Sequence, residues 1–179
     1  MDLESGAGLL ARPGRRGLDW PLRAAPRGVE VPHWVAVHGV DGHSPGIYRW
    51  PDLERPVRAG DHRAELLRVC LDQGLAGDAA YVVIAATPLA GLDDRGYRDA
   101  QLAAGLVEGR LHLAAYALGT SASGMTFVDT EIPGLLGEPE DLAALLFTCV
   151  GVPGYRSRRA GEPGAPTAFR PVTPRLREE

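Results

Sequence analysis

The sequence predicts an α+β domain, and three of its features indicate this class. Trp34–Val40 is a mostly apolar run with β-branched residues, and 79–86 is apolar throughout, so both are typical of strands. Residues 97–118 carry apolar side chains at helical spacing over more than twenty positions. A chain of 179 residues fits a single domain with one core.

The composition divides the chain into three parts. Residues 1–30 are rich in Gly, Pro and Arg and predict an irregular lead-in. The folded domain is expected over 31–160. Residues 161–179 are again rich in Pro, Gly and Arg, and they predict a disordered tail.

The first half of the domain should form a hairpin, a helix and a buried strand. Turn residues at 41–46 separate Trp34–Val40 from a second short strand at 47–50, which predicts a hairpin. Asp61 is a suitable N-cap for a helix that we expect to run to Gln73, with Gly74 ending it. The apolar strand 79–86 follows.

The second half centres on the long helix, expected from Tyr97 to Leu118 and closed by Gly119. Its apolar stripe is so broad that we expect the helix to be central and buried, with an antiparallel or mixed sheet packed on it. Residues 93–95 before it are interpreted as a solvated loop. Residues 121–128 should be extended, and a short helix capped by Asp129 or Thr130 should precede a last strand at 145–150.

Charge and cysteine content exclude several function classes. The net charge of −4 gives no reason to expect a nucleic-acid partner, because such proteins carry a basic face. No apolar run reaches membrane-spanning length, so no membrane partner is expected. Cys70 and Cys149 lie in apolar surroundings without CxxC spacing, which predicts reduced core thiols in a cytoplasmic protein.

Familiar catalytic patterns are missing from the sequence. His33, His38 and His43 are spaced by five, so alternate side chains on a strand would point to opposite faces, and no metal site is expected. Ser121 and Ser123 lack the G-x-S-x-G context of a serine hydrolase, and their segment lacks the GK[ST] of a phosphate-binding loop.

Two segments remain as candidate binding elements. Gly124, Met125, Thr126 and Phe127 follow the long helix among small residues, so their main-chain amides could meet a flat heteroaromatic ligand. The same residues would also suit a strand packed in a core. The arginines of 156–159, among them Arg156 and Arg158, could clamp a phosphate, or they could belong to a charged surface tail.

Four segments in order resemble the nitroreductase family, especially its SagB-type dehydrogenase branch. They are the hairpin 35–49 (VAVHGVDGHSPGIYR), the long helix with its Asp94–Gly105 beginning (DRGYRDAQLAAG) and 112–119 end (HLAAYALG), the segment 123–129 (SGMTFVD) and the strand 146–153 (LFTCVGVP). The resemblance covers roughly 31–160, and it implies an FMN-dependent oxidoreductase that works at a dimer interface.

The resemblance also implies roles for the two candidate binding elements. Gly124, Met125, Thr126 and Phe127 would lie along the flavin ring, and Arg156 and Arg158 would approach its phosphate. Hydride would pass through flavin N5 between NAD(P)H and an organic acceptor, or a peptide-derived heterocycle would be oxidised. The implied partners are a small-molecule or peptide substrate and either a second copy or a complementary nitroreductase-like chain.

The sequence also departs from the family pattern. The arginine-rich opening segment that grips the phosphate is not found, since Arg15 and Arg16 lie among Gly and Pro. Ala103 replaces the usual Glu of the long helix, and Gly109-Arg110 stands where a Gln-Asn pair is common. These departures leave a second hypothesis open, in which the chain is a truncated, cofactor-free relative that serves as a binding or assembly module for a complete partner.

Overall fold

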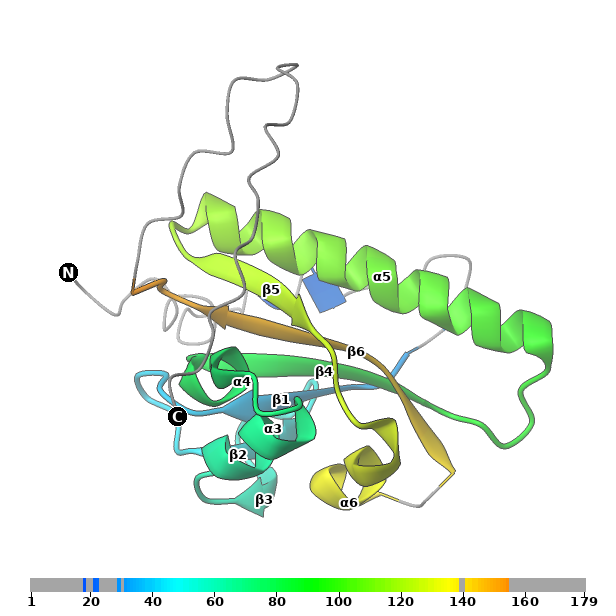
Figure 1. Cartoon of the computed structure of the whole chain (residues 1–179). Coiled ribbons are helices and arrows are strands. Elements are labelled where there is room, and N and C mark those ends of the chain that lie inside the picture. The colour runs from blue at the N-terminus through cyan, green and yellow to red at the C-terminus, as the bar shows by residue number, and fades with distance from the viewer. Residues whose placement is uncertain (1–17, 19–20, 23–28, 30, 139–140, 155–179) are drawn as a thin grey trace, which may run out of the picture.

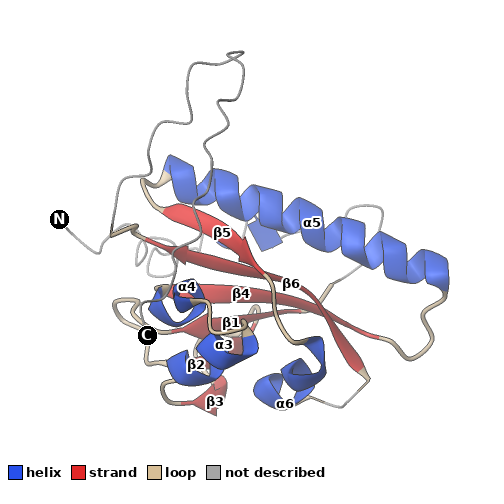
Figure 2. Cartoon of the chain, in the orientation of Figure 1, coloured by secondary structure: helices blue, strands red, loops and turns tan. Residues whose placement is uncertain are grey.

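The computed structural model describes residues 18, 21–22, 29, 31–138 and 141–154 of the chain. In these residues six strands form one antiparallel sheet in the order β3-β2-β1-β4-β6-β5 (Figures 1 and 2). The strands are β1 His33–Val37, β2 Gly46–Arg49, β3 Pro56–Ala59, β4 Tyr81–Pro88, β5 Ser121–Met125 and β6 Leu142–Gly151. The predicted α+β class with an antiparallel sheet and a long helix is confirmed.

Helices cover both faces of the sheet. The long helix α5, Asp94–Ala117, lies across one face (Figure 1). The short helices α3 Arg63–Val69, α4 Gly74–Asp78 and α6 Ile132–Leu136 lie on the other, and a 3₁₀ turn at Asp129–Glu131 leads into α6. Because β4 is central, its alternate residues serve two cores: Val82 and Ile84 pack with α3 and α6, whereas Tyr81 and Val83 pack with α5.

The hairpin and the central strand form where the sequence predicts them. β1 pairs with β2 from Trp34↔Arg49 to Val37↔Gly46, and β1 also pairs with β4. The sequence does not predict strand β3. Its residues Pro56–Ala59 alternate between half-buried and exposed positions, so the strand has no buried face that would give an apolar pattern. Pro56 is its first residue, which is where an edge strand tolerates proline.

The prediction of one helix from Asp61 to Gln73 is wrong. Leu71 and Asp72 adopt left-handed backbone angles, with φ of 58° and 56°, so α3 ends at Val69 and Gly74 begins α4 instead of ending α3. The N-cap position is His62, but the Asp61 carboxylate still accepts a hydrogen bond from the Arg63 amide at 2.9 Å. Local turn geometry therefore overrides the apolar pattern here.

The interpretation of 93–95 as a solvated loop is also wrong. Helix α5 begins at Asp94, and Asp93 is its N-cap, whose carboxylate accepts a hydrogen bond from the Gly96 amide at 2.7 Å. The predicted end is correct: Gly119 has φ of 76° and terminates the helix in the left-handed conformation that glycine adopts without strain.

Replacing Asp93 by Ala should therefore destabilise the fold. We expect Asp93→Ala to lower the free energy of unfolding by about 1 kcal/mol, because the first turn of α5 loses its side-chain acceptor. Urea denaturation followed by circular dichroism measures the loss. Asp93→Asn, which keeps an acceptor oxygen, is the matched control, and an equal loss in both variants would contradict the capping role.

The broad apolar stripe of α5 divides into two faces. One face is buried against the sheet and consists of Ala100, Ala103, Ala104, Val107, Leu111 and Ala115. The other carries Leu102, Leu106, Leu113 and Tyr116, which are exposed in this chain. The helix therefore covers the sheet on one side and presents apolar side chains on the other.

The two cysteines are buried and unpaired, as predicted. Burial raises the pKa of Cys70 to about 11 and the pKa of Cys149 to about 12, with proximity of Cys70 adding to the latter. Both groups are therefore protonated and unreactive thiols at neutral pH. In the described part of the chain, no helix has the length and apolar character needed to span a membrane.

Candidate functional site

The predicted ring-binding segment lies at the edge of the sheet. β5 is the last strand of the described sheet and pairs only with β6, from Ser121↔Gly151 to Met125↔Phe147. Its other edge therefore has no strand partner among the described residues. A flat ligand bound by the main-chain amides of 124–127 would require an edge of this kind.

Side chains in the segment alternate between exposed and core positions. Gly124 and Thr126 are exposed, whereas Met125 and Phe127 pack against the core cluster between the sheet and α3. The Phe127 ring stacks on Phe147 of β6, with ring centroids 4.6 Å apart and planes 29° from parallel. Met125 and Phe127 therefore fit the alternative of a strand packed in the core, whereas ring binding by the main chain of this segment stays a prediction.

The end of the segment is fixed by a main-chain contact to another element. The Val128 amide donates a hydrogen bond to the Val69 carbonyl at the end of α3, at 2.8 Å. Together with the pairing of Gly124 and Met125 to β6 and the Phe127–Phe147 stack, this contact fixes the segment to β6 and to the end of α3. A segment held in this way presents its exposed backbone with little loss of entropy on binding.

A glutamate that the sequence analysis missed lies over Gly124. A Cβ atom added to Gly124 would collide with the Glu108 carboxylate, so this side chain of α5 rests against the strand. Glu108 also lies 3.6 Å from the His112 Nε2, one helical turn onward. The i, i+4 spacing of Glu108 and His112 predicts that the pair is adjacent on a helix, but the approach of Glu108 to Gly124 depends on tertiary structure.

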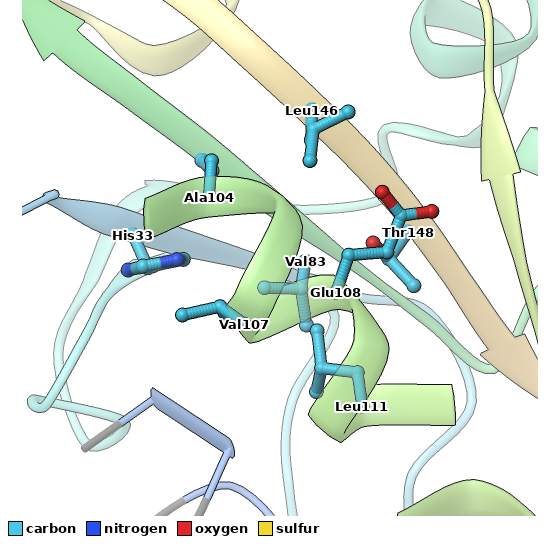
Figure 3. A pocket seen from close by; sticks show the side chains of 9 residues that line it. His33, Val83, Ala104, Val107, Glu108, Leu111, Leu146 and Thr148 are labelled. Atoms are coloured by element: carbon cyan, nitrogen blue, oxygen red, sulfur yellow. The ribbon is translucent and has the colours of Figure 1, made fainter. Parts of the chain in front are cut away.

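A small pocket opens between α5 and the sheet beside this glutamate (Figure 3). Its volume of about 10 Å³ has room for about one water molecule, far below the roughly 300–1,000 Å³ typical of sites for drug-sized ligands and cofactors. Its polar groups come from His33, Glu108 and Thr148, and the remaining walls are Val83, Ala85, Ala104, Val107, Leu111 and Leu146. The pocket contains none of the residues predicted to contact a ring.

His33 is the titratable group deepest in this pocket. It is 5% exposed, and burial lowers its pKa to about 4, with a hydrogen bond to the Val31 backbone acting in the opposite direction. Its Nε2 atom has no hydrogen-bond partner among the described residues. The imidazole is therefore neutral at physiological pH.

The structure places the other candidate residues as follows. His38 is buried, with Nδ1 3.1 Å from the Ala79 carbonyl, whereas His43 lies in the exposed turn after β1. Within the described ranges, no three His, Cys, Asp or Glu side chains are grouped closely enough to hold a metal ion. Arg156 and Arg158, predicted to bind phosphate, lie outside the described residues.

No family model and no curated protein matches the sequence, whereas solved structures match its fold. A protein described as a nitroreductase, from Anabaena variabilis, superposes with a TM-score of 0.68 at 30% identity, over 78% of this chain. The chain has the nitroreductase fold. This nitroreductase-fold chain spans only 33% of the length of that protein.

Two further structures share the fold at lower sequence identity. A chain of the E. coli microcin synthetase McbBCD complex, with truncated pro-MccB17 bound, matches with a TM-score of 0.61 at 14% identity, over 78% of this chain and 62% of its own. A protein described as an NAD(P)H:FMN oxidoreductase, from Staphylococcus epidermidis, matches with a TM-score of 0.57 at 12% identity, over 83% and 81%. At these identities the likeness establishes the fold alone.

The described residues meet part of what FMN would require of this nitroreductase-fold chain. The outer edge of β5 has no strand partner among the described residues, and Gly124 and Thr126 are exposed. Met125 and Phe127 already contact the core, so they would contribute backbone and not side chains. The Glu108 carboxylate, at the far end of a flexible side chain, would have to accommodate a ring placed over Gly124.

Proposed function

We propose that this chain is a flavin-binding oxidoreductase of the nitroreductase type. The observation that carries the proposal is the fold match to the Anabaena protein at 30% identity over 78% of the chain. The reaction would transfer a hydride between NAD(P)H and an organic acceptor, or oxidise a peptide-derived heterocycle as in the SagB-type branch. FMN supplies the hydride chemistry when bound, so the protein itself needs no nucleophile.

The chain's own residues would hold and orient the cofactor. Main-chain groups of Gly124 and Thr126 would lie along the ring, while Met125 and Phe127 anchor the strand to the core. Arg156 and Arg158 would neutralise the phosphate. We propose a cytoplasmic location, a small-molecule or peptide substrate, and either a second copy or a complementary nitroreductase-like chain as partner.

Flavin binding tests the proposal directly. The purified protein should absorb near about 450 nm, as oxidised flavins do, or should quench FMN fluorescence when titrated with it. Gly124→Leu should weaken FMN binding at least about tenfold, because its side chain, which would meet the Glu108 carboxylate, takes the space beside the strand that a ring would occupy. Gly134→Leu, at an open glycine of α6, is the matched control. Wild-type protein that neither quenches FMN nor releases heat with it would refute the proposal.

A binding or assembly module without cofactor is the second candidate function. The Glu108 carboxylate, which rests on Gly124 where a ring would lie, favours it. Light scattering with and without FMN separates the candidates. Association with a complete partner that is indifferent to FMN supports the module, whereas FMN-dependent association supports the oxidoreductase.

A further inference from the structure

Gly124 lies in β5 at a place where the backbone does not require glycine. It pairs with Thr148 of β6, and it is not one of the described glycines with positive φ. Glycine inside a strand weakens the strand, so it often marks a point where another group approaches closely. Here that group is the Glu108 carboxylate of α5, which a Cβ atom at 124 would overlap. The space beside Gly124 is therefore occupied by a side chain of the same protein.

The Glu108 side chain is held loosely in this position. Figure 3 shows it reaching from α5 towards β6, with its carboxylate beside Thr148. The side chain is 22% exposed, and the Nε2 atom of His112 lies 3.6 Å from its Oε1. This separation is longer than the roughly 2.7–3.2 Å of a hydrogen bond. A flexible side chain that is partly in water and not bonded to this neighbour can leave Gly124 at small cost.

His112 offers the carboxylate a second position. It lies four residues after Glu108, so both side chains project from the same side of α5. The His112 side chain is 30% exposed, which leaves it accessible. A change of side-chain rotamer at Glu108 can shorten the 3.6 Å separation to a hydrogen bond with Nε2. The carboxylate thus has two alternative contacts, Gly124 and His112, and only the first of them covers β5.

We propose that Glu108 controls access to the candidate ring site: its carboxylate covers Gly124 in the free chain and turns to His112 when a flat ring binds beside β5. This inference rests on the proposed function, because it concerns the same site, and it adds the residue that regulates that site. A ligand that binds only the uncovered form loses apparent affinity in proportion to the fraction of the chain that is covered. Glu108 therefore weakens ring binding, and His112 relieves part of that weakening.

Titration with FMN tests the control by Glu108. Glu108→Ala should lower the dissociation constant for FMN at least about tenfold, as expected if the carboxylate covers the site about nine-tenths of the time. Fluorescence quenching measures this binding without any turnover. Asp99→Ala removes a carboxylate from the same helix nine residues earlier, and it should leave FMN binding unchanged. Equal tightening in both variants would contradict the proposal, because it would reflect net charge and not the place of Glu108.

A double-mutant cycle tests the role of His112. His112→Ala removes the second position, so the carboxylate stays over Gly124 and the dissociation constant for FMN should rise at least about threefold. In the Glu108→Ala background the same change should have no effect, because no carboxylate remains to be moved. A loss of equal size in both backgrounds would show that His112 acts on the ligand or the fold directly, and it would remove His112 from the proposal.

Nuclear magnetic resonance tests the contact without flavin. The Gly124 amide signal should move in Glu108→Ala and stay in place in Asp99→Ala, and an unmoved signal in the first variant overturns the proposal whatever FMN does. The titrations separate this proposal from the proposed function. Equal FMN binding by the wild type and Glu108→Ala refutes control by Glu108 alone. Binding by Glu108→Ala but not by the wild type supports that control and refutes flavin use by the native chain. Binding by neither protein refutes both.

Discussion

Replacing Phe147 by Ala is expected to lower the free energy of unfolding by about 3–5 kcal/mol. Phe147 is fully buried in the middle of β6, within the core between the sheet and α3 and α6. Its ring also supports Phe127, so truncation removes the partner that holds the candidate ring-binding segment in place. A loss of this size is a large share of the roughly 5–15 kcal/mol that stabilises an ordinary domain.

Chemical denaturation followed by fluorescence or circular dichroism measures this loss. Leu146→Ala is the matched control, because Leu146 is the adjacent residue of β6 but only half-buried, and it should cost clearly less. Phe127→Ala should cost less than Phe147→Ala as well, yet it should weaken FMN binding because the backbone of 126–127 loses its anchor. Equal stability losses at 146 and 147 would contradict this account of the core.

The elements that the sequence predicts well are those whose signal is local. β4 is apolar at nearly every position because both of its faces are buried, and Gly119 ends α5 because its backbone is left-handed. Asp93, by contrast, was interpreted as a loop residue, although an Asp before a helix is also a capping signal. The break at Leu71 and Asp72 has no comparable signal, since neither residue type favours positive φ strongly enough to predict it.

The candidate site was predictable only in part, because several of its contacts join residues that are far apart in the sequence. The segment 124–127 was found through its small residues and its place after the long helix. Glu108 was missed because nothing in the helical pattern reports that its carboxylate rests on Gly124 of another element. The spacing of the histidines argues against a metal site, but it does not reveal that His33 is buried beside α5 with no partner for Nε2 among the described residues.

The two faces of α5 show a further limit of sequence patterns. An apolar stripe wider than one face indicates a helix that is more buried than an ordinary surface helix. It does not show which elements pack against each side. The structure assigns Ala100, Val107 and Leu111 to the sheet and leaves Leu106 and Leu113 outside.

Acidification should destabilise the protein because of His33. Its pKa is 6.5 in an ordinary environment and about 4 in the folded chain, where burial disfavours the charged form. Above pH 6.5 both states are neutral at this site. As the pH falls from 6.5 towards 4, the unfolded chain takes up a proton that the folded chain does not, so stability decreases by up to about 3 kcal/mol. Burial also lowers the pKa of His38, which adds to the loss in the same direction.

Urea denaturation between pH 7.5 and 4.5 measures how the free energy of unfolding changes with pH. The His33→Leu variant shows how much of that change comes from His33. Leucine fills a similar volume among Val83, Leu111 and Leu146, carries no titratable proton and removes the unpartnered Nε2. The variant should therefore lose much less stability over this range than the wild type does, with His38 accounting for part of the remaining slope. An NMR titration of the His33 ring should give a midpoint near pH 4 while the chain stays folded. A midpoint near 6.5, or an unchanged slope in the variant, would show that His33 is solvated and that the pocket beside α5 is open to water.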